Sequence, residues 1–235
     1  MRLAMISMAA MAFMCAAATI TPTPVGIVSG TITYKGNPPK AKLLDTSKEP
    51  TCGKLRAGPL MTEDVVTGPG NALKNVVVFV SSDETVNSPV PSTPATFDQQ
   101  GCQYTTHVLA FRTGQDVKIS NSDPFSHNIH PLAKINREWN RIQLPGTPPF
   151  SYSYREEEFI HVKCNIHAWM QGYFVVLKTS HFAVTGEDGQ FSLPDLPPGR
   201  YTVTAWHESF GTLHQEINVT GSGTQTLDFL FQLKP

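Results

Sequence analysis

Three residues with soft donor atoms stand three positions apart in this chain of 235 residues, namely Cys164, His167 and Met170. Residues 158–164 alternate between hydrophobic and polar side chains, and Gly172 opens a second β-rich run. Such alternation is typical of β-strands, so we expect the three side chains to lie on a short loop between two strands. A given cysteine would have His at +3 and Met at +6 by chance roughly one time in a thousand. The spacing therefore constrains both the fold and the chemistry of this region.

A thiolate, an imidazole and a weak thioether, completed by a second imidazole, are the ligand set of a blue copper centre. The second imidazole is expected upstream in residues 121–130, which contain His127 and His130. Zinc is disfavoured because structural zinc takes four Cys or His donors. An iron–sulfur cluster is disfavoured because it needs several cysteines, and the other cysteines of this chain lack the required spacing. The alternative to a metal site is a buried Cys, a core Met and an exposed His.

Residues 1–18 have the pattern of a bacterial-type export signal. Arg2 is followed by apolar and small residues, and three alanines at 16–18 offer a cleavage site. A membrane anchor or a buried helix is the alternative, although the apolar run is too short to span a bilayer. Cys15 would carry the lipid of an anchored form, but the bulky Met14 before it favours simple cleavage. We therefore expect a periplasmic or secreted protein, bound to a membrane only if Cys15 is lipidated.

The remaining cysteines favour a disulfide, because export places them in an oxidising compartment. If Cys164 binds copper, Cys52 and Cys102 remain in the mature chain, and pairing them leaves no odd thiol. Such a bridge closes a loop of about 50 residues and contributes roughly 4 kcal/mol in the chain-entropy model. The alternative is two free or separately buried thiols.

Charge and turn residues limit the function and the fold class. The 18 basic and 19 acidic residues create no basic field for nucleic acid. The 17 Gly and 19 Pro indicate an all-β chain of one or two domains, with a boundary at the proline-rich segment 88–94. Strands are expected before that segment at 25–34 and 73–80. Beyond it, they are expected at 103–111, 116–120, 126–130, 139–144, 150–154, 158–164 and 172–177.

Several motifs between residues 96 and 178 occur in a fixed order. They are Asp116-Val117-Lys118-Ile119 leading to Asn121, then Ser126-His127-Asn128-Ile129, then Cys164-x2-His167-x2-Met170 followed by Gly172. In this order they resemble a cupredoxin, closest to amicyanin and more distant from plastocyanin. The resemblance implies a Greek-key sandwich of eight strands with one type 1 copper ion bound at one end. The ligands that it implies are His127, Cys164, His167 and Met170.

The resemblance also assigns roles to the neighbouring residues. Asn128 would tie the two ligand loops together, and its position favours His127 over His130 as the ligand. The chain departs from amicyanin at Phe125-Ser126, where that family has a proline before the histidine, and at Trp169 between the last two ligands. With the segment 100–104, these features resemble exported bacterial plastocyanin-like proteins called methylamine utilisation proteins. His107 and His161 are expected to be structural or exposed.

The C-terminal part has a different pattern. Residues 182–193 predict a hairpin with Asp-Gly at its tip, 196–203 turn into another strand, and alternating hydrophobic residues at 227–231 end the chain. This part resembles the carboxypeptidase regulatory-like domain, a transthyretin-like sandwich without peptidase chemistry, and residues 27–36 resemble its first strand. We therefore predict that 25–85 and 180–235 form one sandwich with the cupredoxin domain, 96–178, inserted. A separate N-terminal extension is the alternative.

These features together favour an electron carrier rather than an enzyme, because three strong ligands and a weak one leave no open position on the metal. A redox partner protein is expected to dock near His167, taken as the exposed ligand. Pro124, Phe125 and Trp169 would form an apolar rim there, or else ordinary core packing. A copper carrier or sensor and a cell-surface binding module are the other classes that the sequence allows.

Overall fold

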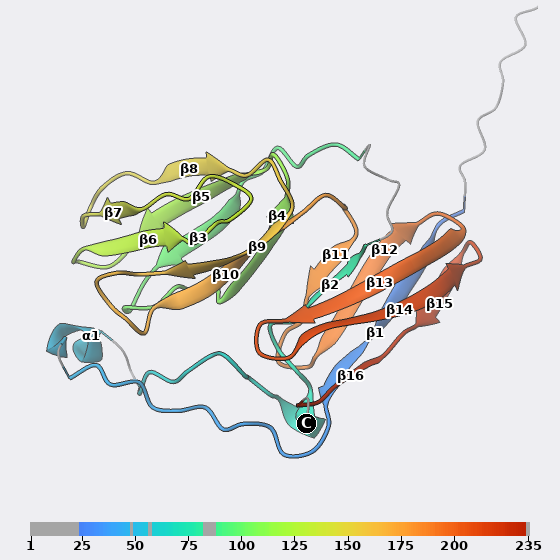
Figure 1. The fold of residues 1–235 in the computed structure, drawn as a ribbon, viewed down its shortest axis with the longest axis horizontal. Coiled ribbons are helices and arrows are strands. Elements are labelled where there is room, and N and C mark those ends of the chain that lie inside the picture. The colour runs from blue at the N-terminus through green and yellow to red at the C-terminus, as the bar shows by residue number, and fades with distance from the viewer. Residues whose placement is uncertain (1–23, 48, 56–57, 82–87, 234–235) are drawn as a thin grey trace, which may run out of the picture.

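The computed structural model describes residues 24–47, 49–55, 58–81 and 88–233. Their regular structure is almost entirely β-strand, arranged as two sandwiches side by side (Figure 1). The all-β prediction is therefore confirmed. The predicted export signal and Cys15 lie outside the described residues. No described helix is long and hydrophobic enough to cross a membrane.

The first sandwich is built from both ends of the chain. One sheet holds β1 (Gly26–Tyr34) between β12 (Gln190–Leu196) and β15 (Gly223–Thr226), and β16 (Phe229–Phe231) also pairs with β1. The other has the order β11-β2-β13-β14, which are Phe182–Val184, Val77–Val80, Gly199–His207 and Gly211–Val219. Hydrophobic residues of both sheets share one core, among them Val28, Ile32, Val78, Val203 and Phe229. Segments far apart in sequence thus fold together.

Two local predictions for this sandwich are wrong. Residues 182–193 do not form a hairpin, because β11 pairs with β2 whereas β12 pairs with β1 in the opposite sheet. The turn at Gly189, whose φ is 65°, carries the chain from one sheet to the other, and its carbonyl accepts the Ile32 N–H. The strand predicted at 73–80 begins only at Val77, because Asn75 has a φ of 63°, which interrupts an extended strand.

The second sandwich is formed by the middle of the chain. Its five-stranded sheet has the order β4-β10-β9-β6-β7, which are Val108–Arg112, Gln171–Leu177, Glu158–Lys163, His127–Pro131 and Arg141–Gln143. Its three-stranded sheet has the order β3-β5-β8, which are Ala95–Gln99, Asp116–Asn121 and Phe150–Ser153. Residues 103–107, predicted as part of a strand, make only an isolated bridge from Tyr104 to Gln99. The reason is a turn at Gly101 and Cys102, which both have positive φ.

A long connection between β1 and β2 crosses from the first sandwich to the end of the second (Figure 1). It contains the short helix α1 (Pro50–Lys54) and, just before β2, the 3₁₀ turn η1 (Pro69–Asn71). A disulfide joins Cys52 of α1 to Cys102 of the second sandwich. We call the described residues within 40–62 the strap. The sequence shows no hydrophobic period in this segment, and the disulfide attaches it to the neighbouring domain.

The two sandwiches meet through a hydrophobic cluster that includes Phe79 of β2 and Val175 of β10. Beside it, the buried His107 contacts Glu208, in the turn after β13, and lies 3.8 Å from Glu63. Burial by itself would lower the pKa of His107, but the hydrogen bond and charge of Glu208, with Glu63 and Asp64, raise it overall. The contact between the sandwiches is therefore both hydrophobic and ionic.

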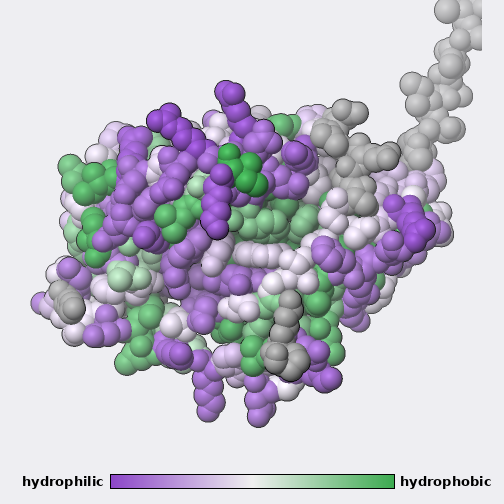
Figure 2. Space-filling view, viewed as in Figure 1, coloured by the Kyte–Doolittle hydropathy of each residue, from purple (hydrophilic) through white to green (hydrophobic). Residues whose placement is uncertain are grey.

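The surface of the molecule is mixed in character. In Figure 2, polar and charged residues cover most of the visible face, and hydrophobic residues occur in separate groups among them. Large hydrophobic side chains that are exposed include Ile166, which is 42% exposed, in the loop between β9 and β10.

Candidate metal centre

The predicted ligands come from two loops at the same end of the five-stranded sheet. Cys164, His167 and Met170 lie between β9 and β10, and His127 is the first residue of β6. The two loops meet because β9 pairs with both β10 and β6. The Cys164 N–H donates to the Met170 carbonyl at 2.9 Å, and the Met170 N–H donates to the His167 carbonyl at 3.0 Å. These bonds close the ligand loop into a tight turn.

Three of the predicted donor atoms lie close together. His127 Nδ1 is 3.0 Å from His167 Nδ1, and Cys164 Sγ is 3.8 Å from that second nitrogen. The three side chains are at most 3% exposed, and their donor atoms all lie within 4.8 Å of one another. Donors that share one ion at bond lengths of about 2.0–2.3 Å lie up to about 4.6 Å apart. The arrangement therefore fits a single bound metal ion.

The surroundings of the two histidines favour their neutral, ligating form. Burial lowers the pKa of His127, although the hydrogen bond and charge of Asp123 act in the opposite direction. Burial and then the neighbouring His127 lower the pKa of His167. Both rings are therefore neutral at pH 7 and have a lone pair available. Cys164 is a buried free cysteine, and its sulfur accepts the His167 N–H at 3.4 Å, which orients the side chain.

Met170 is 1% exposed and belongs to the same hydrophobic cluster as Cys164. Its backbone closes the ligand loop, as described above. A thioether in such a turn would be a weak fourth donor, and this assignment stays a prediction.

Other predicted residues surround the ligands. Asn128 Oδ1 accepts the Asn165 N–H at 2.9 Å, and Asn128 also donates to Asn140, so its side chain links β6 to the Cys164 loop. His130 has other partners, because its Nε2 lies 2.7 Å from Glu138 Oε1 and its Nδ1 lies 3.2 Å from Asn165 Oδ1. His161 lies on β9 with its ring beside Tyr173, at a centroid distance of 5.1 Å.

Asp123 is a buried carboxylate to which the sequence interpretation gave no role. Its Oδ2 lies 2.6 Å from His127 Nε2 and accepts the Cys102 N–H at 2.8 Å, and its Oδ1 accepts the Gly101 N–H at 2.6 Å. Because a carboxylate accepts hydrogen bonds, it places the proton of a neutral His127 on Nε2 and leaves Nδ1 for the metal. The only sequence signal was a carboxylate four residues before the histidine, in a loop without regular spacing.

The prediction that His167 is the exposed ligand is wrong, because this residue is only 3% exposed. The strap covers it. Glu49, Thr51 and Cys52 line a cleft of about 430 Å³ together with Pro124, Phe125, Ser126, Ile166 and His167. The ring of Phe125 lies 5.2 Å from that of His127, and Trp169 Nε1 donates to the Cys102 carbonyl at 3.0 Å. Phe125 and Trp169 are therefore partly buried beside the site, whereas Pro124 is exposed, and the docking role of the three residues stays a prediction.

Part of the chain is similar to a known domain family. The family model of the carboxypeptidase regulatory-like domain matches residues 166–232, which begin in the ligand loop and extend from β10 to β16. The resemblance stated from the C-terminal motifs is therefore confirmed, for less than half of the chain. No curated protein matches the chain.

Solved structures of copper proteins are similar to between 35% and 43% of this chain. Amicyanin from Paracoccus versutus (Thiobacillus versutus) is 18% identical over 43% of this chain and 97% of its own, with a TM-score of 0.33. A purple cupredoxin from Nitrosopumilus maritimus is 21% identical over 35% of this chain and 99% of its own, with a TM-score of 0.31. A copper-containing nitrite reductase from Thermus scotoductus SA-01 is 19% identical over 40% of this chain, with a TM-score of 0.35. The chain covers 26% of that reductase.

Proposed function

We propose that this chain is a type 1 copper protein that transfers single electrons through one copper ion held by His127, Cys164, His167 and Met170. The observation that supports the proposal is the buried cluster of two imidazole nitrogens and one thiol sulfur, brought together from two loops. A soft thiolate beside two neutral imidazoles is a donor set that selects copper. Copper bound there would supply a one-electron couple.

The residues around the donors would hold the site in one shape. Asp123 keeps the His127 proton on Nε2, Asn128 ties the two ligand loops, and the strap leaves His167 only 3% exposed. A site that is already positioned by hydrogen bonds and packing reorganises little when its charge changes by one. This property suits an electron carrier better than a carrier that must release its metal quickly.

We also propose a domain organisation and a location. Residues 25–85, apart from the strap, and 180–235 form a carboxypeptidase regulatory-like sandwich, into which the cupredoxin domain, 96–178, is inserted, and the shared core of β1, β2 and β13 supports this division. Export to the periplasm or beyond follows from the pattern of residues 1–18 and agrees with a disulfide. A redox partner protein would meet the strap and Ile166, because His167 lies beneath them.

The test is spectroscopic. Copper-loaded protein should show an intense thiolate-to-Cu(II) band in the visible region and the narrow EPR splitting of a type 1 site. Cys164→Ser should abolish the band, whereas His161→Ala, on the same sheet but outside the cluster, should leave it unchanged. Copper-loaded protein of unaltered sequence without the band would contradict the proposal.

A further inference from the structure

A second group of soft donors lies against the proposed copper ligands. The sulfur atoms of Cys52 and Cys102 and a ring nitrogen of His167 lie within 4.8 Å of one another. The two cysteines are 2% and 0% exposed and are joined as a disulfide. In this state their sulfurs have little capacity to bind a metal. Reduction would convert them into two thiols beside an imidazole, and these are the donors that a soft metal ion prefers.

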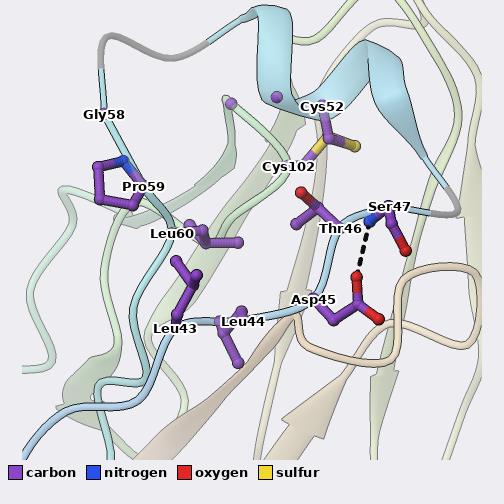
Figure 3. Close-up of a pocket in the computed structure, with 12 residues that line it drawn as sticks. Leu43, Leu44, Asp45, Thr46, Ser47, Cys52, Gly58, Pro59, Leu60 and Cys102 are labelled. Carbon is purple, nitrogen blue, oxygen red and sulfur yellow. Dashed lines mark hydrogen bonds between the residues drawn. A yellow bond between two sulfur atoms is a disulfide. The ribbon is translucent and has the colours of Figure 1, made fainter.

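The disulfide borders two clefts, which offer a route to it. The larger cleft, of about 600 Å³, lies between residues 43–47 and 58–60 of the strap (Figure 3). Leu43, Leu44 and Leu60 form its walls. The disulfide lies at one side of it, where α1 carries Cys52. Cys52 also lines the smaller cleft that contains His167. A reducing dithiol or a metal ion could therefore approach the sulfur atoms from the strap side.

The backbone at both cysteines is held by contacts other than the S–S bond. The Cys102 N–H donates to Asp123 Oδ2, and its carbonyl accepts the Trp169 indole N–H. The Cys52 N–H donates to the Glu49 carbonyl at 3.0 Å at the start of α1. The bond to Glu49 is internal to α1, and it is packing in the hydrophobic cluster of the second sandwich that holds Cys52 there. These contacts do not depend on the disulfide, so they would keep the two sulfurs near His167 after reduction.

We propose that reduction of the Cys52–Cys102 disulfide creates a second metal site, in which both sulfurs and the His167 ring bind Cu(I). A dithiol supplies two electrons and two protons, so the S–S bond breaks, two thiols form, and the dithiol becomes a disulfide. When Cu(I) binds, it replaces the two thiol protons, which pass to water. His167 Nδ1 faces His127 and Cys164, so the added ion would take Nε2.

The experiment measures Cu(I) binding in competition with a Cu(I) chelator, without oxygen, on oxidised protein and on protein reduced with a dithiol that is then removed. Reduction should expose two additional thiols and raise the tightly bound Cu(I) from about one to about two ions per chain. A Cys52→Ser/Cys102→Ser variant should show no increase, whereas Cys164→Ser should keep it. X-ray absorption of the ion added to reduced Cys164→Ser should show bound sulfur atoms, since a soft ion takes thiolate ligands.

The controls separate this inference from the proposed function. His130→Ala alters a histidine close to the loops but outside both donor groups, and it should leave the increase unchanged. A disulfide that resists the dithiol in the folded protein, or two new thiols without added copper, would overturn the inference while leaving the visible band intact. A missing visible band with the increase still present would overturn only the type 1 assignment.

Discussion

Replacing Asp123 by Asn tests whether this carboxylate organises the metal centre. Asp123 accepts the N–H groups of Gly101 and Cys102 and contacts His127 Nε2. Asparagine has nearly the same size, but it has one acceptor oxygen and an NH₂ group, which cannot accept. With the amide oxygen in the Oδ2 position, it can still accept from Cys102 and His127, but the NH₂ group then faces the Gly101 N–H, which loses its acceptor.

The structure allows an estimate of the cost. At least one of the three hydrogen bonds to the charged group is lost, at about 1.5–3 kcal/mol, because the side chain is 5% exposed and water cannot replace it. The other two become hydrogen bonds to a neutral oxygen, which contribute about 0.5–1.5 kcal/mol each instead of about 1.5–3. The neutral amide avoids the desolvation cost of a buried charge, and this offsets part of the loss in stability. The net loss in the free energy of unfolding should be about 2–4 kcal/mol. Copper affinity should fall about 10–100-fold, as for other residues that orient a metal-bound histidine.

Urea unfolding of the metal-free protein gives the stability, and Cu(II) competition with a chelator gives the affinity. Asp98→Asn is a matched control, because Asp98 is only partly buried and accepts the hydroxyl groups of Ser120 and Ser122 at 2.6 and 2.7 Å. It should cost about 1 kcal/mol or less and leave copper affinity unchanged. If Asp123→Asn matched the control in both measurements, Asp123 would not be organising the site.

Three further predictions concern the axial ligand, the domain contact and the disulfide. Met170→Ala should keep copper and colour but shift the reduction potential, and an unchanged potential in voltammetry would remove Met170 from the ligand set. Because the pKa of His107 is raised, its pairing with Glu208 should stabilise the protein fully below pH about 6.5 and lose effect as pH rises through the folded pKa. Urea unfolding across this range should show that dependence, and Glu208→Gln should remove it. Cys52→Ser/Cys102→Ser should lower the free energy of unfolding by roughly 4 kcal/mol, and an unchanged urea midpoint would refute this.

Local patterns in the sequence were sufficient for much of the second sandwich. The alternation in residues 158–164 predicts β9 within a residue, because the two faces of a strand differ in burial. The spacing of Cys164, His167 and Met170 places them in one turn, since a loop between paired neighbours has few shapes. Those features depend on residues that are close together along the chain.

Which sheet each strand joins was not readable from local pattern. The segment 182–193 has the hydrophobic runs and the Asp-Gly turn of a hairpin, yet β11 and β12 pair with different partners. Turn residues indicate where the chain reverses. The partner of each strand depends on which hydrophobic face completes the core, and here that core is shared with β1 and β2 from the other end of the chain.

The surroundings of the metal ligands were decided by tertiary structure alone. The burial of His167 depends on the strap, which carries no hydrophobic period, and on a disulfide between residues separated by 50 positions. The role of Asp123 depends on a turn at Gly101 and Cys102 that brings two N–H groups to its carboxylate. Three of the donor atoms could be read from local spacing, since Cys164, His167 and Met170 share one loop. The coverage and orientation of those donors arise from contacts between segments far apart in the chain, which only folding brings together.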